Sequence, residues 1–284
     1  MYLLKIENLN KFFIDPKSNK HHHILKNVSL DIHEGEKIGI VGESGCGKTT
    51  LAKTILNLLE KVKSDSGKIY FQDRDIHKLN QHHFKPLRSE LQIIYQDPFT
   101  SLNQKMTVRE ILSEALKVKH PKHTRKQLLN DVESLMDVYK IQTQNINKRP
   151  SKLSGGECRR VGIARVMAIK PRFLIADEPV ASLDASIKDQ VMQLLVKHVN
   201  TMMTISHDMR IIQKYVDKIV VIHGGTIVEV AERSDQPFQD GSSFQFSDPC
   251  SKALIASVSY FNSKEESIPI HRCLKPERQS LSQA

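Results

Sequence analysis

The chain has 284 residues, enough for one large domain or two small ones with a sizeable core. Lysine and arginine total 42 against 32 for aspartate and glutamate, so the net charge is +10, which fits nucleic acid, an anionic membrane surface, phosphate ligands or a merely solvated surface. The four cysteines form no Cys-x-x-Cys pair, which argues against a zinc site or a disulfide framework and indicates a reducing compartment. We expect neither a secretory signal nor a membrane helix, because no apolar run approaches roughly 18 residues.

The N-terminal third of the sequence predicts short strands and one helix. Alternating and short apolar runs indicate strands, and helical spacing of apolar residues indicates the helix. A polar turn is expected at 14–23, where IDPKSNKHHH contains three consecutive histidines that we interpret as part of a solvated loop. The predicted strands are 3–10, 28–32, 37–42, 66–72 and 92–98, and the predicted helix is 49–60.

The remainder changes from helical to mixed character. VREILSEALKV at 108–118 and QLLNDVESLMDVY at 127–139 repeat apolar residues at helical spacing with no strand between them, which predicts a helical insertion in an α/β domain. Helices are also predicted at 158–169 and near 187–199, strands at 172–179 and 203–208, and a hairpin with a Gly-Gly turn at 218–230. Residues 262–284 have few apolar positions, and we expect a flexible tail there.

GESGCGKTT at 42–50 matches the phosphate-loop pattern G-x-x-x-x-G-K-[ST] at Gly42, Gly47, Lys48 and Thr49. The loop lies between a predicted strand and a predicted helix, which is the setting that the mechanism needs. Its backbone N–H groups and the helix N-terminus attract phosphate oxygens. Lys48 is expected to reach the β- and γ-phosphates and Thr49 to bind Mg²⁺. We interpret Cys46 as a small loop residue rather than a reactive thiol.

Four polar residues follow or close predicted strands. FLIADEP ends in Asp177 and Glu178, MTISHD contains His207, and QIIYQ closes on Gln96. Ligands gather at the carboxyl ends of strands in open α/β sheets. Asp177 is therefore predicted to help hold Mg²⁺, Glu178 to polarise an attacking water, and His207 to contact the γ-phosphate. The amide oxygen of Gln96 is predicted to touch Mg²⁺ or the water.

A second loop also suits an anion. PSKLSGGECRR at 150–160 places a serine and two glycines at the start of a helix. One nucleotide needs only one phosphate loop, so the second loop requires another explanation.

In order along the chain, these motifs resemble the ATP-binding subunits of ABC transporters. GESGCGKTT resembles Walker A, Gln96 the Q-loop, LSGGE the signature, FLIADEP Walker B, SLD at 182–184 the D-loop, and His207 the switch histidine. Phe13, or its neighbour Phe12, takes the place of the aromatic residue that stacks on adenine. The resemblance covers residues 1 to about 232.

The resemblance implies an α/β fold: a P-loop NTPase of the ABC nucleotide-binding type, with an antiparallel β subdomain and an α-helical subdomain at about 97–165. It implies an ATPase domain at 1–232, a C-terminal extension at 233–261 and a flexible tail at 262–284. It also implies that two subunits pack head to tail, so that Ser154, Gly155 and Gly156 meet the nucleotide of the other subunit while Asp184 links the two sites.

The implied cofactors are ATP and Mg²⁺, and the implied site residues fall into three groups. The expected catalytic residues are Glu178, His207 and Gln96, and the expected metal ligands are Thr49, Gln96 and Asp177. The expected ATP-binding residues are Phe13, Gly42, Glu43, Ser44, Gly45, Cys46, Gly47, Lys48, Thr49, Thr50, Ser154, Gly155, Gly156 and Asp184.

Within the family, QDPFTSLNQKMTV and SDPCSKALIASV resemble stretches of the peptide and nickel importer group. That group implies a second, commonly different, ATPase subunit, two membrane-embedded permease subunits and, indirectly, an external substrate-binding protein, at the cytoplasmic face of the membrane. Gln104 stands where the group has proline, and Glu157 stands where glutamine is commoner.

Three alternatives stay open on the sequence alone. Nickel or a metal chelate is the cargo closest to peptides. A soluble ABC ATPase acting on nucleic acid would use the positive charge, but such proteins usually carry two cassettes or long coiled-coil insertions, and we expect no nucleic-acid partner. A phosphate-loop kinase would leave LSGGE, Gln96 and His207 without a role.

Overall fold

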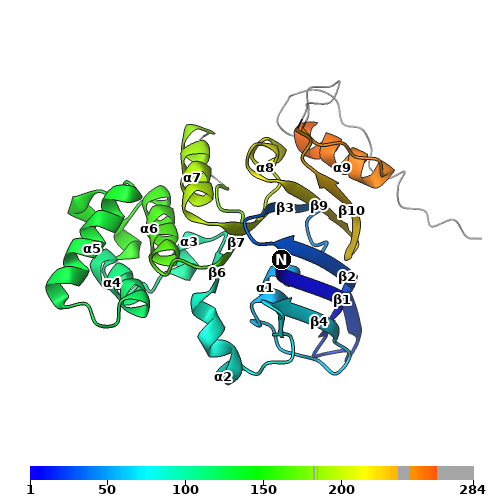
Figure 1. Ribbon diagram of the computed structural model, residues 1–284, viewed down its shortest axis with the longest axis horizontal. Coiled ribbons are helices and arrows are strands. Elements are labelled where there is room, and N and C mark those ends of the chain that lie inside the picture. The colour runs from blue at the N-terminus through cyan, green and yellow to red at the C-terminus, as the bar shows by residue number, and fades with distance from the viewer. Residues whose placement is uncertain (182, 184, 236–242, 261–284) are drawn as a thin grey trace, which may run out of the picture.

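The computed structural model describes residues 1–181, 183, 185–235 and 243–260, and it contains two sheets (Figure 1). The first sheet is antiparallel and has the strand order β2-β1-β4-β5. Its long strands alternate buried and exposed side chains, as expected of a sheet with one face on the core. The strands are β1 (Tyr2–Ile14), β2 (His21–His33), β4 (Ser66–Phe71) and β5 (Arg74–Asp75).

The second sheet has the order β10-β9-β3-β8-β7-β6, and all its neighbouring strands run parallel except β10 and β9. Every residue of β7 and β8 is buried, which explains why FLIAD and TMMTI are apolar almost throughout. The strands are β3 (Lys37–Gly42), β6 (Leu91–Ile94), β7 (Phe173–Asp177), β8 (Thr201–Ile205), β9 (Lys218–His223) and β10 (Thr226–Glu232).

Three longer helices, drawn in green in Figure 1, pack on one another beside the β6 end of the parallel sheet. Each begins with a reciprocal capping box, formed by Thr107 with Glu110, Thr124 with Gln127, and Ser154 with Glu157. These helices are α4 (Val108–Lys119), α5 (Arg125–Val138) and α6 (Gly155–Ala168). The short elements around them are α2 (Gln81–Phe84), η1 (Lys85–Ser89), α3 (Pro98–Ser101), η2 (Thr143–Asn145) and η3 (Pro150–Lys152).

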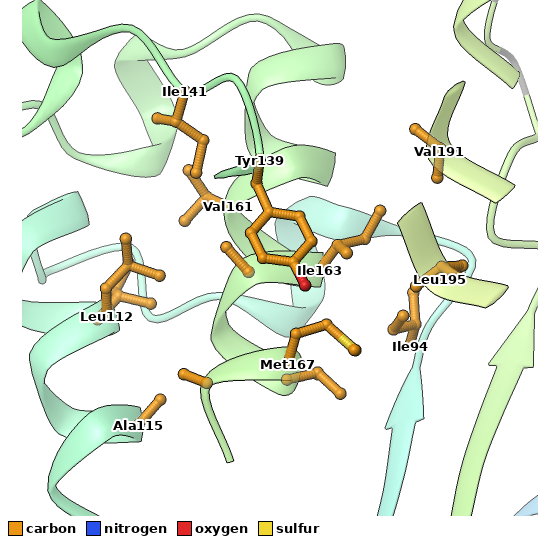
Figure 2. Close-up of a cluster of buried hydrophobic side chains, with 14 of the residues drawn as sticks. Ile94, Leu112, Ala115, Tyr139, Ile141, Val161, Ile163, Met167, Val191 and Leu195 are labelled. Carbon is orange, nitrogen blue, oxygen red and sulfur yellow. The ribbon is translucent and has the colours of Figure 1, made fainter. Parts of the chain in front are cut away.

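One core cluster runs from these helices to the sheet. It joins residues of α4, α5 and α6 to Ile94 of β6 and to Val191 and Leu195 of α7 (Ala185–His198). Figure 2 shows Tyr139 pointing into this cluster, where burial raises the pKa of its hydroxyl to about 12. The continuous apolar packing explains how the helical group is held against the α/β part.

The remaining helices lie against the two sheets. Helix α1 (Lys48–Ile55) buries Leu51, Ala52 and Ile55 in a cluster that also includes the antiparallel sheet. Helix α8 (Met209–Tyr215) and helix α9 (Pro249–Tyr260) share a third cluster with β9, with Phe244 and Leu254 among its buried members. Figure 1 shows α9, in orange, beside the β9–β10 end of the molecule. Within the described residues, no helix has the length and apolar character needed to cross a membrane.

A glycine in the β9–β10 turn connects the two sheets. Gly225 has φ +91° and accepts a 2.8 Å hydrogen bond from the amide of Lys26 in β2. A Cβ at this position would lie 2.2 Å from the carbonyl oxygen of Ile24. Only glycine therefore permits this turn to lie directly against the backbone of the antiparallel sheet.

The structure confirms the predicted α/β class with an antiparallel sheet and a helical group, but it corrects several local predictions. The three histidines do not lie in a polar turn: His21, His22 and His23 belong to β2 and pair with Ile14, Phe13 and Phe12. Backbone pairing with the apolar C-terminal end of β1 extends β2 through these three histidines. The first helix ends at Ile55 rather than near residue 60, and α8 and α9 were not predicted. The predicted tail at 262–284 and the predicted D-loop residues Ser182 and Asp184 lie outside the described residues.

Candidate functional site

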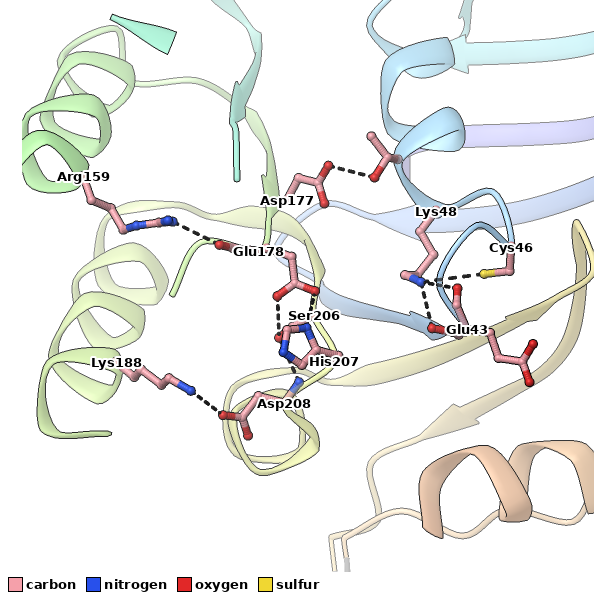
Figure 3. A network of polar contacts seen from close by, with 12 residues as sticks. Glu43, Cys46, Lys48, Arg159, Asp177, Glu178, Lys188, Ser206, His207 and Asp208 are labelled. Carbon is pink, nitrogen blue, oxygen red and sulfur yellow. Dashed lines mark hydrogen bonds and ion pairs between the residues drawn. The ribbon is translucent and has the colours of Figure 1, made fainter. Parts of the chain in front are cut away.

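The phosphate loop lies between β3 and α1, as predicted. Gly47 has φ +111°, and a Cβ there would lie 2.9 Å from a side-chain carbon of Leu25, so both conformation and space require glycine. The Lys48 ammonium donates hydrogen bonds of 2.7 Å to the carbonyl oxygens of Gly42 and Glu43, as Figure 3 shows for this loop. These contacts place a positive charge within the loop, next to the N-terminus of α1.

Thr49 and Asp177 meet across the gap between the loop and β7. The Thr49 hydroxyl donates a 3.0 Å hydrogen bond to the Asp177 carboxylate (Figure 3). Asp177 is 6% exposed, and burial raises the pKa of its carboxyl, although the bond from Thr49 and the charge of Lys48 act in the opposite direction. A hydroxyl beside a carboxylate is an oxygen donor set that suits Mg²⁺.

This burial makes a testable prediction about stability. A carboxyl whose pKa is raised binds a proton more tightly in the folded chain than in the unfolded chain, so ionised Asp177 lowers stability at pH values above that pKa. We expect Asp177→Asn to raise the melting temperature of the nucleotide-free protein by several degrees at neutral pH. The difference should shrink as the pH falls through the raised pKa.

Thermal unfolding of both proteins across a pH series measures this effect. Asp189→Asn is the matched control, because hydrogen bonds from Lys214 and Tyr215 lower the pKa of Asp189, so its loss should destabilise the protein at neutral pH. A melting temperature of Asp177→Asn at or below wild type at neutral pH would contradict the prediction.

Glu178 and His207 form a direct pair at the ends of β7 and β8. The His207 Nδ1 lies 2.7 Å from a carboxylate oxygen of Glu178, and the Ser206 hydroxyl lies 3.5 Å from the other (Figure 3). Glu178 has φ +50°, which is uncommon for a residue with a side chain. Its amide donates a 2.9 Å hydrogen bond to the carbonyl oxygen of Ile205, which holds this bend beside β8.

These groups line one cavity of about 360 Å³, a volume in the range of small-molecule sites. The phosphate loop, the Thr49–Asp177 pair, the Glu178–His207 pair and Gln96 all line the cavity. Residues from four separate predicted motifs therefore meet there. Its lining residues are Gly42, Ser44, Gly45, Gly47, Lys48, Thr49, Thr50, Gln96, Asp177, Glu178, Ile205 and His207.

Two loop residues named by the sequence pattern do not line this cavity. The carboxylate of Glu43 lies 4.0 Å from His223, and its side chain is 45% exposed. Cys46 is buried under the loop, and burial raises the pKa of its thiol despite the nearby Lys48 ammonium. A thiol with a raised pKa is a poor nucleophile, in agreement with the interpretation of Cys46 as a packing residue.

The second glycine-containing loop lies outside the cavity. Ser154 and Gly155 are exposed, and none of Ser154, Gly155 and Gly156 is among the lining residues. Ser154 caps α6, and its hydroxyl donates a 2.9 Å hydrogen bond to Glu157. The bonds from the amide and hydroxyl of Ser154 and from Asn145 lower the pKa of the Glu157 carboxyl, which stabilises its ionised form.

Phe13 lies at the end of β1. The Lys11 ammonium lies 5.7 Å from the centre of the Phe13 ring, and Lys11 pairs with Leu25, whose side chain approaches Gly47 of the phosphate loop. Alternate strand residues share a face, so Phe13 is on the face of Lys11 and Leu25. Phe12 instead stacks on His23, with ring centres 4.1 Å apart.

Sequence reasoning missed two polar residues at this site. Ser206 is 1% exposed and Arg159 is 6% exposed, and both contact Glu178. The sequence gives only a partial signal for Arg159: it lies between Cys158 and Val161 in a helix that is mostly buried, where an arginine must find acceptors, but its partners are not marked. The sequence gives no comparable signal for Ser206.

Known proteins with similar sequences are ATP-binding proteins of transporters, in agreement with the phosphate loop described above. The ABC transporter family model matches residues 25–181. The oligopeptide transport ATP-binding protein OppF of Salmonella typhimurium is 38% identical over 251 residues, covering 87% of this chain and 72% of that protein. The dipeptide transport ATP-binding protein DppF of Lactococcus lactis is 36% identical over 260 residues, covering 90% and 81%.

The fold also matches that of a solved ATP-binding cassette. The ATP-binding cassette MJ0796, a dimer in a post-hydrolysis state with ADP and Pi, superposes with a TM-score of 0.73 at 25% identity, covering 81% of this chain and 98% of that one. The fold, the composition of the cavity and these similarities agree with one another. The chain belongs to the ABC transporter family and is an ATP-binding, ATP-hydrolysing member of it.

Proposed function

We propose that this chain is the ATP-hydrolysing subunit of an importer for oligopeptides or dipeptides, and that it works as one half of a pair of cassettes. The observation that carries the proposal is the separation of the two phosphate-facing loops. One lines the cavity, whereas the exposed Ser154 loop has no part in it. An ATP held by Lys48 in a second cassette supplies the anion that the Ser154 loop lacks.

The residues of the cavity divide the work of hydrolysis. The backbone N–H groups of the phosphate loop and Lys48 bind and orient the triphosphate. Glu178, with one carboxylate oxygen 2.7 Å from His207, accepts a proton from the attacking water, while His207 fixes that carboxylate and faces the γ-phosphate. Phe13, a residue that is 39% exposed, provides the surface on which adenine stacks.

Thr49 and Asp177, with the Gln96 side chain, would hold Mg²⁺. All three residues line the same cavity as Lys48, which is where the β- and γ-phosphates would lie. Magnesium held by these residues would supply positive charge to neutralise the charge that develops on the phosphate oxygens. Burial raises the pKa of Asp177, and a divalent cation beside it would favour its ionised form.

Dimer closure and opening convert ATP binding and hydrolysis into movement. Ser154, Gly155 and Gly156 donate to the γ-phosphate of the second cassette, and Asp184, which is outside the described residues, would act at the interface that connects the two sites. The second cassette is commonly a different chain in this group. The assembly holds the pair at the cytoplasmic face of the membrane, beneath two permease subunits that receive substrate from an external binding protein.

The proposed domain division follows the same scheme. Residues 1–232 form the ATPase domain, with a helical subdomain at about 97–165 that contacts the permease subunits. We assign residues 233–261 to a C-terminal extension, and the expected tail at 262–284 lies outside the described residues. The burial of Phe244 and Leu254 beside β9 and α8 supports an extension that packs on the ATPase domain itself.

Transport by the reconstituted assembly tests the proposal. The chain would be purified with the membrane proteins that accompany it, placed in proteoliposomes with ATP on the cassette side, and supplied with labelled di- and oligopeptides and the matching binding protein. We expect ATP-dependent peptide uptake, and no uptake when the chain carries Glu178→Gln. Uptake of radioactive nickel but not of peptide would show that the cargo is nickel rather than peptide. Salt-sensitive RNA or DNA binding without membrane partners would overturn the importer role.

A further inference from the structure

The proposed hydrolysis needs no residue at position 159, yet the buried Arg159 contacts two parts of the site. Its guanidinium donates hydrogen bonds of 3.0 Å and 2.9 Å to the carbonyl oxygens of Glu178 and Pro179. A third bond, of 2.7 Å, goes to the carbonyl oxygen of Gln96. Figure 3 shows the arginine reaching from α6 to the backbone of Glu178.

A buried cation with this arrangement is costly unless it is well solvated by the protein. Burial lowers the pKa of Arg159, and the carboxylates of Asp97 and Glu178 oppose that effect. The planar fork of an arginine can satisfy acceptors on two separate segments at once, which a lysine ammonium cannot do in the same geometry. The side chain therefore joins the segment after β6 to the segment after β7.

The contact with Glu178 acts on a strained residue. The amide of Glu178 is held by Ile205, its carbonyl oxygen is held by Arg159, and its φ is +50°. Holding both sides of the residue stabilises the bend that directs the carboxylate to His207. Loss of the arginine would free the carbonyl side and allow the carboxylate to leave its position.

The same helix carries the loop of Ser154. Arg159 lies five residues after Ser154, and Arg165, one and a half turns further along α6, donates to the carbonyl oxygen of Ser101. Helix α6 thus holds the segment from Gln96 to Ser101 near both of its ends. A displacement of α6 must carry this segment and the Glu178 backbone with it, or break these bonds.

We propose that Arg159 is a positioning residue, which ties the main chain of Glu178 and Gln96 to the helix that begins at Ser154. Contact between Ser154 and the nucleotide of a second cassette then aligns the carboxylate of Glu178 in this chain's own site. This inference rests on the proposed function, because it takes the Ser154 loop to meet a second nucleotide.

Steady-state ATP hydrolysis by the complete assembly with Arg159→Met tests the role. We expect kcat to fall by about 10- to 100-fold, the range of a misplaced catalytic group, while KM for ATP stays within about twofold of wild type, because no phosphate contact is lost. The Hill coefficient for ATP should fall towards one. Arg159→Lys should recover part of kcat, since an ammonium can still reach one of the two segments.

Arg109→Met is the matched control, because Arg109 is a half-buried arginine of α4 and the described contacts place it at neither segment. It should keep kcat, KM and the Hill coefficient. A variant at Arg159 that keeps wild-type kcat, or loses kcat and ATP affinity only in proportion to its unfolded fraction, would overturn the inference. If Arg159→Met does not fold, the same readouts on Arg159→Lys decide. A wild-type assembly without ATPase activity would instead overturn the proposed function.

Discussion

Glu178→Gln should stop ATP turnover and leave ATP binding intact. Glutamine keeps the shape of the side chain but cannot accept the proton from water, and loss of a general base lowers rates by about 10²–10⁴-fold. Lys48, Thr49 and the phosphate loop, which we propose bind the triphosphate, are unchanged. We expect kcat to fall by at least about 100-fold, the dissociation constant of ATP to change by less than about threefold, and an ATP-bound dimer to accumulate.

Three measurements on one preparation check this: phosphate release, equilibrium binding of a fluorescent ATP analogue, and molar mass by light scattering with and without ATP. Glu34→Gln is a control for loss of a carboxylate, because Glu34 lies on the surface and pairs with Arg172. Turnover near the wild-type rate would remove Glu178 from the role of the base. Loss of ATP binding would show that the substitution disturbs the loop instead.

Ser154→Arg should separate nucleotide binding from dimer formation. The exposed Ser154 loop does not line the cavity of its own chain, so a bulky cation there leaves that cavity unchanged. In the closed pair it would occupy the space of the second nucleotide. We expect the monomer to bind ATP within about twofold of wild type, while ATP no longer drives dimer formation and turnover falls at least about 100-fold.

The substitution also removes the N-cap of α6, which costs about 1 kcal/mol. A thermal melt must therefore confirm that the variant is folded at the assay temperature. Ser134→Arg places the same side chain on an exposed position of α5 and should behave as wild type. If Ser154→Arg abolished ATP binding by the monomer, the loop would serve its own chain's site and the half-site model would be wrong.

Short-range pattern was sufficient to predict most of the fold. Strand β7 and the helices α4 and α5 were predicted because their apolar residues follow clear periods over enough length. The extension of β2 through His21–His23 was not predictable in this way. Three consecutive polar residues predict a turn. They adopt a strand because they pair with Phe12, Phe13 and Ile14 of β1. Helix α8 was missed because seven residues are too few for a period to show.

The site was predictable where a motif fixes chemistry on one segment, and unpredictable where the backbone supplies the acceptors. The motifs placed Lys48 in the loop between a strand and a helix and placed Asp177 and His207 at strand ends, and the structure brings them to one cavity. Arg159 depends on three carbonyl oxygens from residues 96, 178 and 179. Carbonyl groups are the same in every residue, so no side-chain pattern marks them as partners, and the contact becomes visible only in three dimensions.

The close contact of Gly225 with Ile24 has a mechanical consequence. Backbone contacts backbone there, and one buried cluster contains side chains of both sheets, so we expect the antiparallel sheet with Phe13 and the parallel sheet with the phosphate loop to move together. We therefore expect a movement around a nucleotide to displace the helical group relative to both sheets rather than one sheet relative to the other. An alanine at position 225 would clash with the backbone of Ile24. We expect it to separate the two sheets and so to shift Phe13 relative to the phosphate loop.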